Sequence, residues 1–230
     1  MNTDEAVNDT LHLIDDAARD RVVVRGPDAA SYLQSQIAQE IRDLDVGAAR
    51  WTLVLDPTGK VDVLARIRRV EGEVFVLDTD AGFGDALLAR INRFKIRVDA
   101  ETTVEHAAVS TSSVEHELAR ISAGWPKMGA EIVPGSTIPS TTGIVGLAVN
   151  FQKGCYPGQE LVERMDSRGA DAPRSLRIVD LTIGSAVGDA VADADGNDVG
   201  VITSVSPDSD LGLAYVKRGV DVGRIPPLLA

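Results

Sequence analysis

The sequence predicts an α+β fold, and three observations support that class. Of the 230 residues, 44% are hydrophobic, so the chain can bury a sizeable core. Between residues 21 and 122, short β-branched runs alternate with patterns of helical period. After Pro173 only short strands and turns follow, which is typical of a small antiparallel β-barrel or sandwich. We therefore predict a flexible tail at residues 1–10, an α+β domain at residues 11–172 and a β-barrel domain at residues 173–230.

The first domain is expected to hold alternating strands and helices and then a long loop. Predicted strands cover residues 21–25, 51–55, 61–70, 74–77 and 103–109, and an Asp-Pro-Thr-Gly turn at residues 56–59 joins the second to the third. A helix begins at Pro27, and Leu33, Ile37 and Ile41 give it a buried stripe at four-residue spacing. Further helices are predicted over residues 85–94 and 114–122. Glycine and proline punctuate residues 124–143, which are expected to form a long loop.

The second domain is expected to consist of strands and turns alone. Its predicted strands cover residues 177–183, 199–205 and 211–216. Residues 193–198 (Asp-Ala-Asp-Gly-Asn-Asp) faintly resemble a calcium loop, but Asp198 and Ser204 would stand where glycine and glutamate are required. We therefore interpret them as a hairpin turn.

The overall charge excludes several classes of partner. The net charge is −12, so attraction of the whole chain to nucleic acid or to an anionic membrane is not expected. The single cysteine cannot form an intrachain disulfide, and the acidic start resembles neither a signal peptide nor a transit peptide. No apolar run approaches the roughly 18 residues of a membrane span. The sequence therefore predicts an acidic, cytoplasmic protein.

Charge is distributed unevenly along the chain. Residues 86–98 carry Arg90, Arg93, Lys95 and Arg97 without an acidic residue, and Arg66, Arg68 and Arg69 lie on a predicted neighbouring hairpin. Residues 180–216, in contrast, carry seven aspartates and neither lysine nor arginine. Two interpretations of the basic residues stay open at this point: a solvated surface, or a local site for a small anion.

Common catalytic and metal-binding motifs are missing. The sequence contains neither a phosphate-binding P-loop nor a dinucleotide-binding glycine motif, and none of its three histidines lies in a zinc pattern. No metal site is therefore predicted.

The most informative segment surrounds the only cysteine. Gly154 and Gly158 allow a tight backbone path around Cys155, and a helix is predicted over residues 158–165 with Leu161, Val162 and Met165 facing inward. A position just before a helix N-terminus, two residues from Lys153, favours the thiolate. The alternative is an inert, buried thiol.

This segment resembles a known signature. Residues 153–160 (KGCYPGQE) match the KGCYxGQE block of the YgfZ family, relatives of the glycine-cleavage T-protein, at every position except Pro157, which the pattern leaves free. Flanking segments resemble the family in the same order along the chain. Residues 55–61 resemble its DPxG[RK]V hairpin, residues 93–97 its RFxxR block, and residues 121–132 its R-I-x-x-G-x-P…G-x-E-[IL] segment. Residues 166–169 continue the signature, and residues 199–204 and 212–216 resemble the closing barrel.

The resemblance implies ferredoxin-like, T-protein-type lobes around a tetrahydrofolate-binding channel, followed by a small antiparallel β-barrel. It also implies a role in making or maintaining iron–sulfur clusters in client proteins, including tRNA-modifying enzymes. Cys155 would be the functional thiol, facing the channel. Folate-binding candidates are Lys153, Tyr156, Gln159 and Glu160, with Arg93, Lys95 and Arg97 for the anionic glutamate tail.

The chain departs from the family pattern at three places. Ungapped alignment puts Val63 and Leu64 where the T-protein carries two aspartates, and Asp62 falls on the opposite face of the strand from Val63. The second lobe is shortened to about residues 98–120, and residues 138–141 (Ile-Pro-Ser-Thr) lack a typical acidic residue. We therefore expect an accessory role without aminomethyl transfer. The alternatives are a folate-dependent one-carbon enzyme, a thiol-based enzyme using Cys155, and a shortened relative that only binds protein partners.

Overall fold

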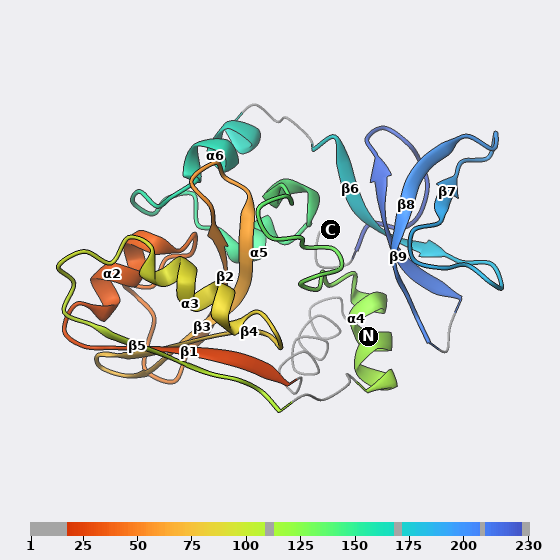
Figure 1. The fold of residues 1–230 in the computed structure, drawn as a ribbon. Coiled ribbons are helices and arrows are strands. Elements are labelled where there is room, and N and C mark those ends of the chain that lie inside the picture. Colours follow the sequence, from red (N-terminus) through yellow and green to blue (C-terminus); the bar gives the residue numbers. More distant parts are fainter. Residues whose placement is uncertain (1–17, 109–112, 168–171, 208–209, 227–230) are drawn as a thin grey trace.

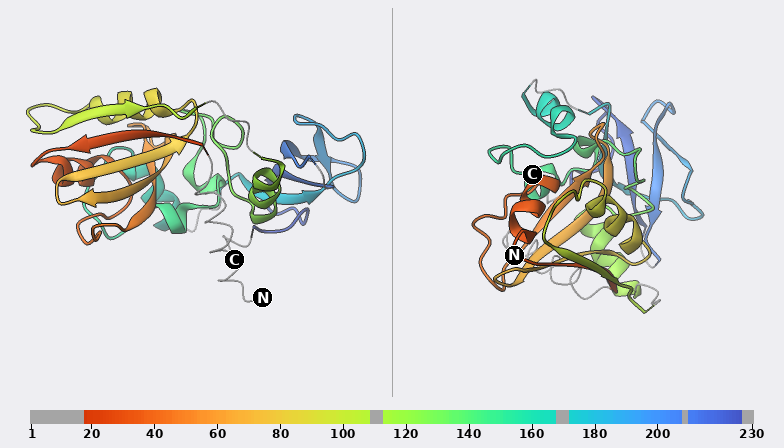
Figure 2. Two further views of the ribbon diagram at one scale, coloured as in Figure 1. Left: turned by 90° about the horizontal axis from the view of Figure 1, so that it is seen from below. Right: turned by 60° about the vertical axis from the view of Figure 1, so that its left-hand side comes forward.

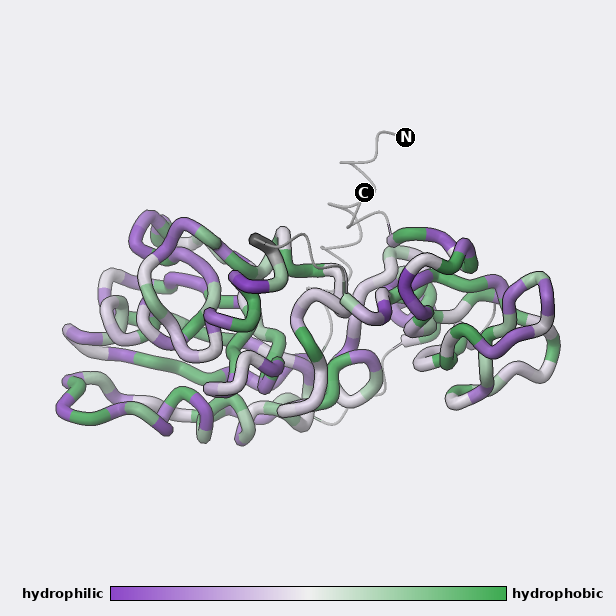
Figure 3. The backbone as a smooth tube through the Cα atoms, turned by 90° about the horizontal axis from the view of Figure 1, so that it is seen from above, coloured by the Kyte–Doolittle hydropathy of each residue, from purple (hydrophilic) through white to green (hydrophobic). Residues whose placement is uncertain are grey.

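The computed structural model describes residues 18–108, 113–167, 172–207 and 210–226, which form two antiparallel sheets at opposite ends of an elongated molecule (Figures 1 and 2). The first sheet has the strand order β2-β3-β4-β1-β5 and the second β6-β9-β8-β7. Hydrophobic stretches run through both sheets, and hydrophilic ones concentrate in loops (Figure 3). The predicted α+β class is confirmed.

The strands of the first sheet are β1 (Arg19–Arg25), β2 (Ala49–Leu55), β3 (Val61–Glu71), β4 (Val74–Asp80) and β5 (Glu101–Glu105). The helices α2 (Ala29–Gln36) and α3 (Gly84–Asn92) cover one face of this sheet. The Tyr32 hydroxyl of α2 donates a hydrogen bond to the carbonyl of Ile91 in α3, which holds the two helices together. Their apolar stripes pack on Ile67, Leu77 and Val22, which lie side by side on adjacent strands.

The first helix is shorter than the spacing of its apolar residues predicts. α2 ends at Gln36, and Ile37 is already extended (φ −113°, ψ 159°), so Ile41 is buried outside the helix. The amide of Ala38 donates to the carbonyl of Leu53, because the chain leaves the helix there to join the edge of β2. The strand predicted at residues 103–109 is instead β5, at Glu101–Glu105, and Val109 lies outside the described residues.

The other face of the first sheet carries a row of large polar and aromatic side chains. Trp51, Arg66 and Asp78 occupy directly opposed positions on β2, β3 and β4. Arg66 Nε donates to Asp78 (3.1 Å), and Arg19 pairs with the same carboxylate. Both guanidinium groups lie over the Trp51 ring: that of Arg19 is 5.1 Å from the ring centroid, and that of Arg66 is 5.7 Å from it. These contacts allow charged groups to be buried, because each is paired and stacked.

The long loop at residues 124–143 covers this face. Trp125 lies 4.6 Å from the Trp51 ring, and Met128 Sδ accepts the amide of Leu64 (3.3 Å). As predicted, this loop holds little regular structure: η1 (Pro139–Thr141) is its one described helical turn, and the short helix α5 (Val145–Ala148) follows it. It is bounded on the N-terminal side by α4 (Val114–Ala123), which ends at Gly124 in the left-handed region (φ 71°), a usual helix C-cap.

The second sheet is open among the described residues, so a closed barrel is not seen. Its strands are β6 (Arg174–Asp180), β7 (Ala190–Ala192), β8 (Asp198–Val205) and β9 (Leu211–Lys217). β7 was not predicted, because three residues are too short for a periodic signal. Ile121 of α4 packs with Leu176, Ile178 and Leu213, so the core of this sheet includes a helix from the predicted first domain.

Some predictions fall outside the described residues. These are the flexible tail at residues 1–10 and the end of the signature at residues 168–169. Among the described helices, none has the length and hydrophobicity of a membrane-spanning segment.

Candidate functional site

The signature cysteine lies beside a hollow of about 590 Å³ between the β2–β3 turn and the start of α6 (Gln159–Ser167). The Cys155 side chain is exposed, so the alternative of a buried thiol is wrong. The hollow is lined by Pro57 and Thr58 from the turn, the loop residues 155–158, and Gln159, Glu160, Leu161 and Arg164 from the helix. Its volume lies within the range of small-molecule sites.

The β2–β3 turn is stiffened by the Asp56 side chain. Its Oδ1 accepts hydrogen bonds from the amide of Thr58 (2.8 Å), the hydroxyl of Thr58 (2.8 Å) and the amide of Lys60 (2.9 Å). Burial raises the pKa of Asp56, but these hydrogen bonds outweigh it and hold the pKa below its usual range. The turn is thus a rigid wall of the hollow.

The turn and the signature loop meet through two glycines. Gly59 and Gly158 both have positive φ, at 87° and 83°, and a side chain on either would collide with the other segment. A Cβ on Gly158 would overlap the Asp56 carbonyl oxygen and lie 2.9 Å from Cα of Gly59. The two motifs therefore form one structural unit. Each motif is visible in the sequence, but their contact is not, because no local pattern encodes it.

We expect Gly158→Ala to lower the free energy of unfolding by about 2–3 kcal/mol, because it combines an unfavourable φ with a backbone collision. Gly154→Ala is the matched control in the same loop, since nothing lies within 4 Å of its Cβ position and its φ is not positive. Urea unfolding of both variants measures the difference. Equal stability of the two variants would contradict the proposed contact.

Lys153 is directed into the protein. Its Nζ donates to the carbonyls of Gln34 (2.6 Å), Ile37 (2.5 Å) and Gln39 (3.2 Å), which uses all three N–H donors of the ammonium group. The residue is 8% exposed and does not line the hollow. Burial lowers the pKa of Lys153 to about 8, although Glu40 opposes the shift. Lys153 thus ties the cysteine loop to the carbonyls at and beyond the end of α2.

The other signature residues surround the start of α6. The side chain of Gln159 accepts the amide of Tyr156 (2.9 Å), which fixes the bend of the loop before the helix. Tyr156 is 7% exposed, and its hydroxyl is buried without a hydrogen-bond partner among the described residues. Burial, followed by the charge of Glu163, raises the pKa of Tyr156 to about 12.

The side chains of α6 differ in their exposure. Glu160 is exposed at the rim of the hollow. Of the residues expected to face inward from α6, Val162 is buried, whereas Leu161 and Met165 are half-buried.

The basic residues are not a single surface. Arg66 is buried against Asp78, and Arg90 is 4% exposed, with Nε donating to the carbonyl of Leu55 (2.7 Å). The interpretation of these residues as part of a solvated or anion-binding face is therefore wrong for Arg66 and Arg90. Arg93 and Arg97 are exposed and Lys95 is half-buried, but none of the three lines the hollow beside Cys155.

The strand position of the T-protein aspartates is apolar and closed. Val63 and Leu64 are 0% and 2% exposed. Asp62 lies 3.6 Å from Nε of Arg90, and burial, followed by the charge of Asp56, raises its pKa. No group of three or more potential metal ligands occurs among the described residues.

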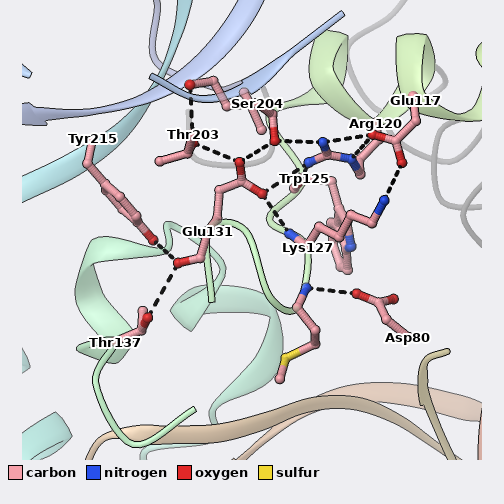
Figure 4. A network of polar contacts seen from close by, with 12 residues as sticks. Asp80, Glu117, Arg120, Trp125, Lys127, Glu131, Thr137, Thr203, Ser204 and Tyr215 are labelled. Atoms are coloured by element: carbon pink, nitrogen blue, oxygen red, sulfur yellow. Dashed lines mark hydrogen bonds and ion pairs between the residues drawn. The ribbon is translucent and has the colours of Figure 1, made fainter. Parts of the chain in front are cut away.

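A second polar centre joins the first sheet to the second (Figure 4). Glu131 is 1% exposed, and its carboxylate accepts from Arg120 (3.2 Å) and from the hydroxyls of Thr203 (2.7 Å) and Ser204 (2.6 Å). The Tyr215 hydroxyl donates to the Glu131 carbonyl (2.8 Å). A shallower hollow of about 420 Å³ lies beside this centre. Glu131 lies within the resembling segment at residues 121–132, but its role could not be predicted from the sequence.

The chain is similar in sequence to proteins of two names. No family model matches the chain. It is 28% identical over 216 residues to the tRNA-modifying protein YgfZ of Serratia proteamaculans, covering 65% of each protein. It is 26% identical over 264 residues to the mitochondrial iron-sulfur cluster assembly factor IBA57 homolog of Pyricularia oryzae, covering 90% of this chain and 66% of that protein. The chain is thus similar in sequence to YgfZ and IBA57 proteins. It spans just under two thirds of the length of these two relatives.

The structure of this chain is similar to a solved T-protein. The crystal structure of the glycine cleavage system aminomethyltransferase T from Bartonella henselae aligns with a TM-score of 0.74 and 14% identity, covering 97% of this chain and 90% of that one. At that identity the likeness establishes the fold. The chain therefore has a T-protein-like fold, with residues 155–160 placed beside the β2–β3 turn and at the start of α6.

Proposed function

We propose that this protein is a tetrahydrofolate-binding accessory factor that supports the assembly or maintenance of iron–sulfur clusters in client enzymes, including tRNA-modifying ones. The names of its YgfZ and IBA57 relatives support this role. The observation that carries it is the joining of the KGCYPGQE segment and the Asp56–Gly59 turn into one hollow with an exposed thiol. The client proteins would meet the molecule at Cys155.

The residues of the hollow fit a folate in part. The prolines at positions 57 and 157 and the Tyr156 ring supply apolar walls for an aromatic ring system, and Arg164 supplies one cation for a carboxylate. Lys153 is fully engaged with backbone carbonyls, so we assign it a positioning role instead of a ligand contact.

The proposed function is an accessory one. Aminomethyl transfer in the T-protein manner would require a carboxylate at the strand position held here by Val63 and Leu64, and both of these side chains are buried and apolar. We further propose that the second sheet corresponds to the closing barrel of the family, and that the first sheet with α2 and α3 corresponds to one ferredoxin-like lobe.

Calorimetric titration with tetrahydrofolate tests the proposal. We expect saturable binding that weakens about tenfold in Arg164→Gln, because one charge-assisted contact to a carboxylate contributes about 1.4 kcal/mol. Arg68→Gln, at an exposed position on the far hairpin, is the matched control and should bind as the wild type does. Absence of heat, together with an unchanged melting temperature at saturating tetrahydrofolate, would refute folate binding and favour a relative that binds protein partners only.

A further inference from the structure

A basic, apolar loop projects from one end of the molecule. This basic loop, Arg93–Arg97, follows α3 and exposes Phe94 (40%) and Ile96 (78%) between its three cations. Among the residues that the structure describes, none forms an ion pair or hydrogen bond with the charged groups of Lys95 or Arg97. Two exposed hydrophobic side chains framed by cations form a small patch of the kind found in protein interfaces.

The backbone of the basic loop is held in an unfavourable shape. Arg97 has φ 55°, the only positive φ at a non-glycine residue among the described residues. The amides of Lys95 and Ile96 donate to the carbonyls of Asn92 (3.2 Å) and Phe94 (3.0 Å), which keeps the turn closed. Strain of this kind persists where the surroundings enforce it, and it is concentrated at binding and catalytic sites.

An acidic, apolar edge lies at the opposite end of the molecule. This acidic edge consists of β7 with its flanking turns and carries the exposed residues Ile183 (101%), Val187 (64%), Asp189, Asp195 and Asp198. β7 pairs only with β8 in the described sheet, so its outer backbone groups have no strand partner. No lysine or arginine occurs between residues 180 and 216. Lys217 donates to the carbonyl of Asp198 (2.8 Å), but no described cation pairs with the carboxylates of Asp189, Asp195 or Asp198.

We propose that the basic loop of one molecule docks on the acidic edge of a second copy of this chain. The two surfaces match in charge, and each places exposed apolar side chains among its charges. They lie at opposite ends of the elongated molecule, so a molecule cannot pair its own loop with its own edge (Figure 2). The contact is heterologous and joins copies head to tail. It goes beyond the proposed function, because neither surface lines the hollow beside Cys155.

Sedimentation velocity on the full chain tests the contact. We expect the weight-average sedimentation coefficient to rise with protein concentration at about 20 mM salt and to return to that of the monomer at about 0.5 M salt, because exposed charges are screened there. A monomer at every concentration in low salt would overturn the proposal, whatever the result of the folate titration.

Charge reversal identifies the two surfaces. Arg97→Glu and Asp195→Lys should each weaken self-association about tenfold, the effect of 1.4 kcal/mol. Arg68→Glu and Glu71→Lys, which make the same charge changes on the exposed β3–β4 hairpin, are the matched controls and should associate as the wild type does.

Mixing the two reversed variants gives the decisive measurement. In an equimolar mixture the unaltered basic loop of Asp195→Lys can dock on the unaltered acidic edge of Arg97→Glu, so the mixture should associate more strongly than either variant alone. Unchanged association in the Arg97→Glu variant would overturn the proposal. A mixture that associates no more strongly than its components would also overturn it. Weaker folate binding by Arg97→Glu together with unaltered sedimentation would overturn it as well, and would assign the loop to binding the glutamate tail of folate.

Discussion

Replacing Glu131 by glutamine is expected to lower the free energy of unfolding by about 3–5 kcal/mol, the largest effect we expect from a single substitution. The carboxylate is buried and accepts hydrogen bonds from Arg120, Thr203 and Ser204 (Figure 4). Glutamine has nearly the same shape but no charge, and its NH₂ group would face donors. Arg120 is 3% exposed, so it would keep a buried positive charge with only Glu117 as an ionic partner.

Urea unfolding followed by circular dichroism and by tryptophan fluorescence measures this effect. Trp125 reports on the joint directly, because its carbonyl accepts Arg120 (2.9 Å) and its ring stacks near Trp51. Loss of Glu131 should separate the fluorescence transition from the circular dichroism transition, since the two sheets would no longer unfold together. Glu105→Gln, at an exposed position on β5, is the control. A loss below about 1 kcal/mol for Glu131→Gln would show that this centre does not hold the sheets together.

Replacing Lys153 by methionine is expected to cost about 2–4 kcal/mol of stability and to loosen the cysteine loop. Methionine fills a similar volume but leaves the carbonyls of Gln34, Ile37 and Gln39 without their donor. Alkylation of Cys155 should become faster in the variant, because the loop loses its attachment to the end of α2. Lys95→Met, at a position without a described charge partner, should change neither quantity.

The pH dependence of stability provides an independent check on Lys153. Its pKa of about 8 in the folded protein lies below the value of about 10.4 for an unfolded chain, so between these pH values the unfolded state binds more protons. The stability of the wild type should therefore rise relative to Lys153→Met as the pH increases from about 8 to about 10. A difference that stays constant over this range would contradict the burial of the charge.

Several features of the fold were predictable because they depend on neighbouring residues. The Asp-Pro-Thr-Gly turn and the helix α4 follow from local conformational preferences. The Ile37 and Ile41 stripe misled the prediction of helix length, since both residues are buried by the sheet after the helix has ended. The three-residue strand β7 exists because β8 offers it a partner, and its own sequence carries no such signal.

The sequence by itself determined the α+β class, most strand positions, the family resemblance and the segment that carries the only cysteine. Tertiary structure alone decided what the charged residues do. Lys153 reaches a carbonyl 116 positions away, Arg66 and Arg90 turn into the interior, and Glu131 joins the two sheets across 73 positions to Ser204. Spacing along a chain does not reveal such contacts, because burial and pairing depend on which distant segments the fold brings together.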